Sequence, residues 1–367
     1  MKFYCVAGEN SGDLHGSFLV KALLDQMPGI HIRGVGGERM QAAGMELFLK
    51  NDSLNLMGFV EVIKHLPHLL HTLEAVKRDI INFQPNAVIL IDYPGFNLRL
   101  AKYLKRHGIK VYYYISPQVW AWKESRINIL KECVDKLFVI LPFEVDFFER
   151  HDILAEFYGH PLLDAIASYV PAPLPPEVNP ENKSIIAVLP GSRAHVVQRM
   201  LPAFLSLIPY FRDYQFIIAG THNIDTRFYQ KYIASTPATL VVGKTYDLMK
   251  AADFALVTSG TATLETGLFQ VPMLVGYKGN WLSMELAKRL VKVKSITLVN
   301  LVLDQPLVPE FIQNDLTPRK LVPVINQYLR SPTFAQQTKL ALAKLPGLLG
   351  GVGVSERLAK RIIALNI

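Results

Sequence analysis

Two short turns in the second half of the chain carry residue types that bind phosphate. An apolar run, 254–257, leads into the turn Thr-Ser-Gly-Thr at 258–261 and then into a helical pattern. A small-residue turn before a helix presents backbone N–H groups and the positive end of the helix dipole, so it binds anions. Glu265 lies one helical turn further on, where a carboxylate can bond a ribose diol. The spacing predicts a nucleotide-diphosphate site with the contacts Ser259, Gly260, Thr261 and Glu265.

A second turn of this kind comes earlier in the chain. It reads Pro-Gly-Ser-Arg at 190–193 and follows the apolar run 185–189. The guanidinium of Arg193 is a planar fork with a permanent charge, which suits phosphate oxygens. Either turn alone is also typical of a short strand-to-helix connection. The two in this order favour a paired grip on a diphosphate that includes Gly191, Ser192 and Arg193.

Three acidic residues in the first half are candidates for a general base. Glu9 and Asp13 lie in a glycine-rich turn after the apolar run 3–7, and Asp92 follows the apolar run 87–91. Open α/β enzymes place such groups at the carboxyl ends of strands. Local alternatives are a helix N-terminal charge for Asp13 and an Asx turn for Asp92. The glycine spacing does not match GxGxxG, which disfavours a nicotinamide enzyme.

These turns need a scaffold of parallel strands. Apolar, strand-like runs alternate with helical patterns on both sides of the proline-rich stretch 171–180, which predicts an α/β, doubly wound sheet in each half. We therefore expect two Rossmann-like domains that face a central cleft. The boundaries are an N-terminal domain 1–168, a linker 169–183, a C-terminal domain 184–346, and a terminal helical segment 347–367. That segment either crosses back to the first domain or packs on another subunit.

Composition narrows the function classes. The 367 residues carry a net charge of +8, which favours an anionic partner. Nucleic acid is disfavoured because the sequence has no zinc knuckle, RNA-recognition signature or long basic run. No apolar run approaches the ~20 residues of a membrane span, and no signal peptide is evident, so we expect a cytoplasmic location. Cys5 and Cys133 lack metal-type spacing.

Eight motifs carry a family resemblance across nearly the whole chain. They begin at residues 7, 116, 141, 159, 189, 259, 272 and 298 and read AGExSGD, SPQVWAW, LPFE, GHP, LPGSR, SGTATLE, PMLVGY and LVNL. The chain resembles the lipid-A-disaccharide synthase family, inverting glycosyltransferases of the GT-B fold. The resemblance implies transfer of 2,3-diacylglucosamine from UDP-2,3-diacylglucosamine to 2,3-diacylglucosamine 1-phosphate (lipid X), giving lipid A disaccharide 1-phosphate and UDP. It also places Tyr277 at the donor site and Asn300 among the catalytic residues.

The chain departs from the family at one position. The family often has a second aspartate just after the proline of the segment 92–97, and that aspartate is its favoured base, whereas this chain has Gly95. The base is then Asp92, or else Glu9 or Asp13. The sequence has no Asp-x-Asp, so we expect no metal and no other cofactor. Arg193 and the helix ends would instead neutralise the diphosphate.

An apolar segment with basic neighbours precedes residue 71. Such a segment suits insertion at an anionic membrane surface, and acylated substrates would require contact with the inner membrane. An ordinary buried helix is the alternative. A UDP-sugar 2-epimerase and a non-catalytic lipid-binding protein remain alternative functions, and a homodimer is an open possibility. The expected membrane or acyl contacts are Leu56, Met57, Phe59, Val60, Ile63 and Leu66.

Overall fold

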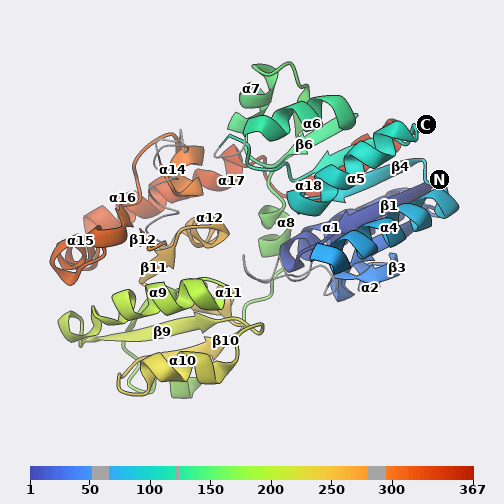
Figure 1. Ribbon diagram of the computed structural model, residues 1–367. Coiled ribbons are helices and arrows are strands. Elements are labelled where there is room, and N and C mark those ends of the chain that lie inside the picture. The colour runs from blue at the N-terminus through green and yellow to red at the C-terminus, as the bar shows by residue number, and fades with distance from the viewer. Residues whose placement is uncertain (52–65, 121–123, 280–294) are drawn as a thin grey trace. The chain divides into compact units, whose positions relative to one another are not determined.

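The computed structural model describes residues 1–51, 66–120, 124–279 and 295–367 (Figure 1). The chain divides into two compact units. The N-terminal unit comprises Met1–Tyr169 together with Leu349–Ile367, and the C-terminal unit comprises Val170–Leu348. Each unit contains a parallel sheet with alternating helices, so the predicted α/β fold with two doubly wound sheets is confirmed.

The described part of the N-terminal unit has a seven-stranded sheet in the order β3-β2-β1-β4-β5-β6-β7, and every neighbouring pair is parallel. The order reverses between β1 and β4. The carboxyl ends of these two strands therefore form the topological switch point, where open α/β sheets bind ligands. The strands are β1 (Lys2–Ala7), β2 (His31–Gly36), β3 (Glu46–Lys50), β4 (Ala87–Ile91), β5 (Val111–Tyr114), β6 (Lys136–Val139) and β7 (Ala155–Phe157).

Helices cover both faces of this sheet. Tyr4 and Val6 of β1 pack in one apolar cluster with α4 (Leu66–Phe83), α5 (Pro94–Arg106) and α6 (Ile127–Cys133). Phe3 and Cys5 point to the opposite face and pack with α1 (Asn10–Gln26) and α18 (Val354–Ala364). Burial on both faces explains why β1 and β4 are apolar throughout. The shorter helices are α2 (Glu38–Ala42), η2 (Glu124–Arg126), α7 (Phe143–Glu149) and α8 (Leu162–Ala167).

The terminal helix α18 is held on the N-terminal unit by polar contacts as well as by its apolar face. The carboxylate of Asp164 accepts hydrogen bonds from the backbone N–H groups of residues 353–355, at 2.7, 3.1 and 2.8 Å. Arg361 donates two hydrogen bonds to Glu156, at 2.8 and 2.9 Å. The start of the helix is therefore capped by a side chain nearly 190 residues earlier in the chain.

The described C-terminal unit has a six-stranded parallel sheet in the order β10-β9-β8-β11-β12-β13, with its switch point between β8 and β11. Its strands are β8 (Ser184–Leu189), β9 (Tyr214–Gly220), β10 (Thr239–Val242), β11 (Phe254–Thr258), β12 (Met273–Tyr277) and β13 (Glu310–Ile312). Its helices are η3 (Pro176–Val178), α9 (Ala194–Leu205), η4 (Ile208–Tyr210), α10 (Thr226–Ile233), α11 (Thr245–Ala251), α12 (Thr261–Leu268), α14 (Leu298–Leu303), η5 (Gln313–Asp315), α15 (Pro318–Arg330), α16 (Pro332–Leu342) and α17 (Leu345–Leu348).

Candidate functional site

The two anion-binding turns flank the switch point of the C-terminal unit. One follows β8 and the other follows β11, and these strands pair directly. Gly191 has φ +108°, a region that favours glycine, and a Cβ placed there would lie 4.0 Å from Cγ2 of Thr258. The turns therefore adjoin each other, as a paired grip on one diphosphate requires.

Each turn leads into a helix whose N-terminus lies at this edge of the sheet. Arg193 is exposed and occupies the N-cap position of α9. Gly260 occupies the N-cap position of α12 with φ +149°, and a Cβ there would meet nothing within 4 Å. The first N–H groups of a helix have no partner within it, so both helix ends attract negative charge. Asn223 braces the first turn by donating a hydrogen bond to the carbonyl oxygen of Ser192 at 2.9 Å.

Ser259 does not offer its hydrogen-bond donors to a ligand. Its backbone N–H donates to the carbonyl of Gly276 at 3.0 Å, and its hydroxyl donates to the carbonyl of Ile296 at 2.8 Å. Ser259 therefore positions the turn, and its predicted contact with the diphosphate stays a prediction. Within the turn, the backbone amides of Gly260 and Thr261 at the helix start are the groups that suit a phosphate.

Glu265 lies on α12, where Tyr246 of α11 orients it. The Tyr246 hydroxyl donates to Oε1 of Glu265 at 2.8 Å. Burial raises the pKa of the Glu265 carboxyl, and the hydrogen bond from Tyr246 opposes that rise. Sequence reasoning missed Tyr246, although a tyrosine one residue into a helix after a glycine turn is a recognisable signal. Tyr277 ends β12, the strand beside β11, and is partly buried.

We expect Glu265→Ala to raise the KM for the nucleotide-sugar donor more than it lowers kcat. The reason is that a ribose contact is made equally in the ground state and the transition state. Steady-state kinetics with varied donor checks this, and Glu177→Gln, an exposed site in the same unit, is the control. An unchanged donor KM would remove Glu265 from the site.

Asn300 makes internal hydrogen bonds on every side-chain atom that can form them. Its amide N–H groups donate to the carbonyl of Val308 at 2.8 Å and to Glu310 at 3.0 Å, and its Oδ1 accepts from the N–H of Val308 at 2.8 Å. The side chain is buried, with 5% of its surface exposed. These contacts tie α14 to the segment before β13. The structure therefore gives Asn300 a positioning role, and its predicted catalytic role stays a prediction.

Three polar side chains at this edge were not singled out from the sequence. The buried Thr258 hydroxyl has no hydrogen-bond partner among the described residues. The methyl group of the same side chain lies near Gly191. Arg199 and Lys278 line a cavity of about 480 Å³ between α9 and the end of β12. The position of Lys278 directly after a strand and of Arg199 within a helix after the first turn could have indicated these two basic residues from the sequence. Their positive charge adds to that of Arg193 at the same sheet edge.

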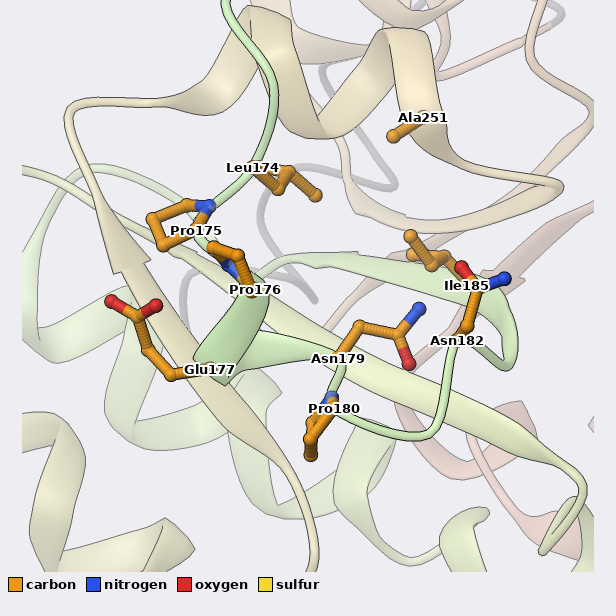
Figure 2. Close-up of a pocket in the computed structure, with 9 residues that line it drawn as sticks. All are labelled: Leu174, Pro175, Pro176, Glu177, Asn179, Pro180, Asn182, Ile185 and Ala251. Atoms are coloured by element: carbon orange, nitrogen blue, oxygen red, sulfur yellow. The ribbon is translucent and has the colours of Figure 1, made fainter.

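A larger cavity, of about 630 Å³, lies at the other end of β8 (Figure 2). Its walls come from the proline-rich segment, together with Ile185 and Ala251. Ile185 belongs to the start of β8, whereas the anion-binding turn follows the end of that strand. We therefore do not assign this cavity to the candidate site.

In the N-terminal unit, Glu9 and Asp92 lie on the two sides of the switch point. Ala7 at the end of β1 pairs with Ile91 at the end of β4, so Glu9 and Asp92 follow paired residues. The ring of Tyr93 lies against Gly8, where a Cβ would come within 2.3 Å of it. Only glycine permits this approach, which brings the loop of Glu9 into contact with the loop of Asp92.

The backbone of Asp92 is held in an unusual conformation. Asp92 and Tyr93 have φ of 48° and 47°, which costs residues other than glycine about 1–3 kcal/mol each. The N–H of Asp92 donates to the carbonyl of Tyr114 at 3.0 Å. Its carbonyl accepts from the Tyr113 hydroxyl and the buried Asn97 amide, both at 2.7 Å. Tyr113 and Asn97 are thus positioning residues that the sequence did not reveal.

The environment of Asp92 suits a base that works near neutral pH. Burial and, to a smaller extent, the negative charge of Glu9 raise the pKa of Asp92 to about 6, although the backbone amide of Tyr93 opposes the rise. A carboxylate with this pKa is ionised at pH 7 and is a stronger base than an ordinary aspartate. The geometry therefore favours Asp92 over the other acids.

Asp13 is hydrogen-bonded to the segment that follows β2. Its carboxylate accepts hydrogen bonds from the backbone N–H groups of Gly37 at 2.7 Å, Arg39 at 3.2 Å and Met40 at 3.1 Å. Three donors on one buried carboxylate fix the start of α2 against α1. Asp13 thus has a positioning role in the structure, and its predicted catalytic role stays a prediction.

A buried carboxylate also organises the loop after β5. Glu144 is 1% exposed and accepts from the Ser116 hydroxyl at 3.1 Å and the Trp120 indole N–H at 3.0 Å. Its second oxygen accepts from the backbone N–H groups of Ile140 and Leu141, at 3.1 and 2.9 Å. Trp120 is thereby fixed in the loop after β5, the strand that pairs with β4. Trp122 lies outside the described residues.

Two further sequence-based assignments concern the same unit. Gly95 is exposed, and a Cβ there would meet nothing within 4 Å, so the position has room for the family's aspartate. The expected membrane contacts Leu56, Met57, Phe59, Val60 and Ile63 lie outside the described residues, and the side chain of Leu66 is also not described.

Comparison with known sequences identifies relatives along the whole chain. The family model described as Lipid-A-disaccharide synthetase matches residues 3–340. The lipid-A-disaccharide synthase of Syntrophus aciditrophicus is 38% identical over 371 residues, covering 99% of this chain and 96% of the relative. The Geobacter metallireducens protein of the same name is 37% identical over 369 residues, with 98% and 96% covered.

Solved structures share the fold at low identity. S. aureus MnaA in a co-structure with UDP matches with a TM-score of 0.72 and 14% identity, over 100% of this chain and 97% of that one. The calicheamicin glycosyltransferase CalG4 matches with a TM-score of 0.60 and 15% identity, over 99% and 97%. Epimerases and glycosyltransferases both occur among these neighbours, so the architecture alone does not select the reaction.

Proposed function

Since the chain belongs to the lipid-A-disaccharide synthase family and is a glycosyltransferase of lipid A biosynthesis, we propose that it transfers 2,3-diacylglucosamine from UDP-2,3-diacylglucosamine to lipid X. The adjoining anion-binding turns at the switch point of the C-terminal unit carry this proposal, because they suit the diphosphate of a UDP-sugar. Family membership decides against the epimerase and the non-catalytic lipid-binding protein.

Transfer with inversion needs one base and one direct displacement. Asp92 takes the proton from the 6-hydroxyl of lipid X as that oxygen forms a bond to the anomeric carbon of the donor. The bond from that carbon to the diphosphate oxygen breaks at the same time, and UDP leaves with the electron pair. Glu9 keeps the pKa of Asp92 raised, which strengthens the base while leaving it ionised at neutral pH.

The leaving group gains negative charge as its bond breaks. The N-terminal amides of α9 and α12 are oriented before the reaction, so they stabilise this charge without reorganising. The guanidinium of Arg193, at the start of α9, adds a positive charge there. Glu265, oriented by Tyr246, bonds the ribose hydroxyls and contributes to donor affinity.

The reaction is tested by the dependence of UDP release on the acceptor. The protein is incubated with UDP-2,3-diacylglucosamine, with and without lipid X. Release of UDP only with lipid X, together with a disaccharide 1-phosphate product, supports transfer. UDP release without lipid X would indicate hydrolysis, and no release in either case would contradict the proposed substrates.

Activity should survive EDTA, because arginine and helix ends neutralise the diphosphate. The sequence has no Asp-x-Asp, and among the described residues no group of three or more His, Cys, Asp or Glu side chains is arranged to hold a metal ion. We expect turnover within about twofold of the untreated enzyme. By contrast, removing a needed Lewis acid would raise the activation barrier by several kcal/mol. Loss of activity that Mg²⁺ restores would contradict the metal-free mechanism.

We further propose that the protein binds the surface of the inner membrane from the cytoplasm. Within the described part of the chain, no helix has the length and apolarity needed to cross a bilayer. The acylated substrates and the net charge of +8 support contact with an anionic surface. On α4, Leu70 and Ile81 expose 46% and 39% of their surfaces beside the exposed basic residue Arg78.

Serine at Leu56, Phe59 and Ile63 should weaken binding to anionic vesicles. Each inserted apolar side chain contributes roughly 1.5–3 kcal/mol to binding. When the vesicles are sedimented, the triple variant should therefore remain mostly in the supernatant. Leu154→Ser is the matched control, since Leu154 is 82% exposed elsewhere in the N-terminal unit. A lower melting temperature with unchanged vesicle binding would favour the buried-helix alternative.

A further inference from the structure

One carboxylate, Glu310, holds the segment that leads into α14. Its Oε2 accepts from the N–H of Ile296 at 2.9 Å. Its Oε1 accepts from the N–H of Thr297 at 3.1 Å, the Thr297 hydroxyl at 2.8 Å and the Asn300 amide at 3.0 Å. The Ser295 hydroxyl donates to the same oxygen. Five donors converge on this carboxylate, four on Oε1 and one on Oε2.

The segment held in this way supports the diphosphate turn. The carbonyl of Ile296 accepts the hydrogen bond of the Ser259 hydroxyl at 2.8 Å, while the Ser259 N–H donates to Gly276 at 3.0 Å. Ser259 is therefore held between β12 and Ile296. Gly260 and Thr261 follow directly, so the directions of their N–H groups depend on where Ser259 lies.

We propose that Glu310 is a positioning residue for the diphosphate of the donor. It fixes Ile296, which fixes the Ser259 hydroxyl, and this sets the amides at the start of α12. The inference rests on the proposed function, because it requires a diphosphate at this turn. Glu310 acts through this segment and Ser259, not by touching the diphosphate, since a carboxylate in contact with the diphosphate would repel it.

Glu310 needs both the charge and the shape of its carboxylate to hold this segment. Glutamine has the same size but one acceptor oxygen, and its NH₂ group would face N–H and O–H donors. At least one donor of the segment then loses its partner, and the segment shifts to recover a hydrogen bond. A misplacement of about 1 Å in groups that orient a substrate can cost up to about 10²-fold.

The experiment measures UDP affinity by titration calorimetry for Glu310→Gln, Ser259→Ala and the double variant. We expect each single variant to weaken UDP binding by about tenfold and to raise donor KM alike, with lipid X KM unchanged. If Glu310 acts through Ser259, the double variant binds UDP no more than about twofold more weakly than either single variant. Additive losses, or unchanged UDP affinity in Glu310→Gln, would overturn the inference.

Two controls separate this role from general destabilisation. Glu177→Gln removes an exposed charge in the same unit and should leave UDP affinity unchanged. If Glu310→Gln does not fold, Thr297→Val and Thr297→Ser replace it. The serine variant keeps the hydroxyl donated to Glu310 and should bind UDP normally, whereas valine should not; equal affinities would refute the inference. Wild-type UDP binding tests the proposed function separately.

Discussion

Asp92→Asn should lower kcat by about 10²–10⁴-fold while UDP still binds. Asparagine keeps the size and most hydrogen bonds of aspartate but cannot accept the proton of the acceptor hydroxyl. The wild-type rate should fall below about pH 6, because the raised pKa of Asp92 is near that value and only the ionised form is a base. Initial rates from pH 5 to 8, with saturating substrates, measure both effects.

Glu9→Gln is the matched variant for this prediction. Removing the charge of Glu9 should lower the pKa of Asp92, so the acidic limb of the profile moves to lower pH while much of the activity remains. If Asp92→Asn retains most of its activity and Glu9→Gln does not, the base is Glu9. Gly95→Asp gives a second comparison because its Cβ meets nothing within 4 Å. Partial recovery in the Asp92→Asn background would indicate that a carboxylate at either position reaches the acceptor.

Arg193→Ala should reduce kcat by about 10²-fold or more and leave the fold intact. The guanidinium interacts most strongly with the charge that develops on the leaving diphosphate, so its loss raises the barrier more than it weakens donor binding. Arg193 is exposed, and its removal leaves no buried cavity. Turnover under saturating donor measures the effect.

Arg193→Lys keeps a positive charge but loses the planar fork, so we expect it to recover only part of the rate. Arg212→Ala is the control, because this exposed arginine lies in the same unit just before the start of β9. That start pairs with the start of β8, whereas the turns follow the ends of β8 and β11. A near-normal kcat in Arg193→Ala would contradict its role at the leaving group, while a loss of melting temperature would assign it to stability.

Local chemistry made the turns and the strands of this protein predictable. Apolar runs that end in glycine turns describe a strand buried on both faces and a tight connection, and both properties depend on neighbours in the sequence. The turns at Gly191 and Gly260 therefore occur as predicted, with positive φ at both glycines. The strands β2, β3, β7 and β13 were not predicted. Of these, β3, β7 and β13 are short edge strands, and their partly buried sides show weaker apolar patterns.

Tertiary structure alone decided what several polar residues do. Asp13 was a candidate base, but its carboxylate meets N–H groups 24 to 27 residues away. Asn300 was assigned to catalysis, but the chain returns at Val308 and Glu310 to use its side chain fully. Hydrogen-bond partners that lie on other elements cannot be predicted from the local sequence.

The raised pKa of Asp92 also depends partly on the local sequence and partly on the tertiary structure. The sequence determined that an aspartate follows a buried strand, and its motifs placed the chain in a family. Its basicity depends on burial and on Glu9, which the pairing of β1 with β4 brings close across more than 80 residues. The electric field at a carboxylate is set by charges near it in space, so only the folded sheet distinguishes the surroundings of Asp92 from those of an ordinary aspartate.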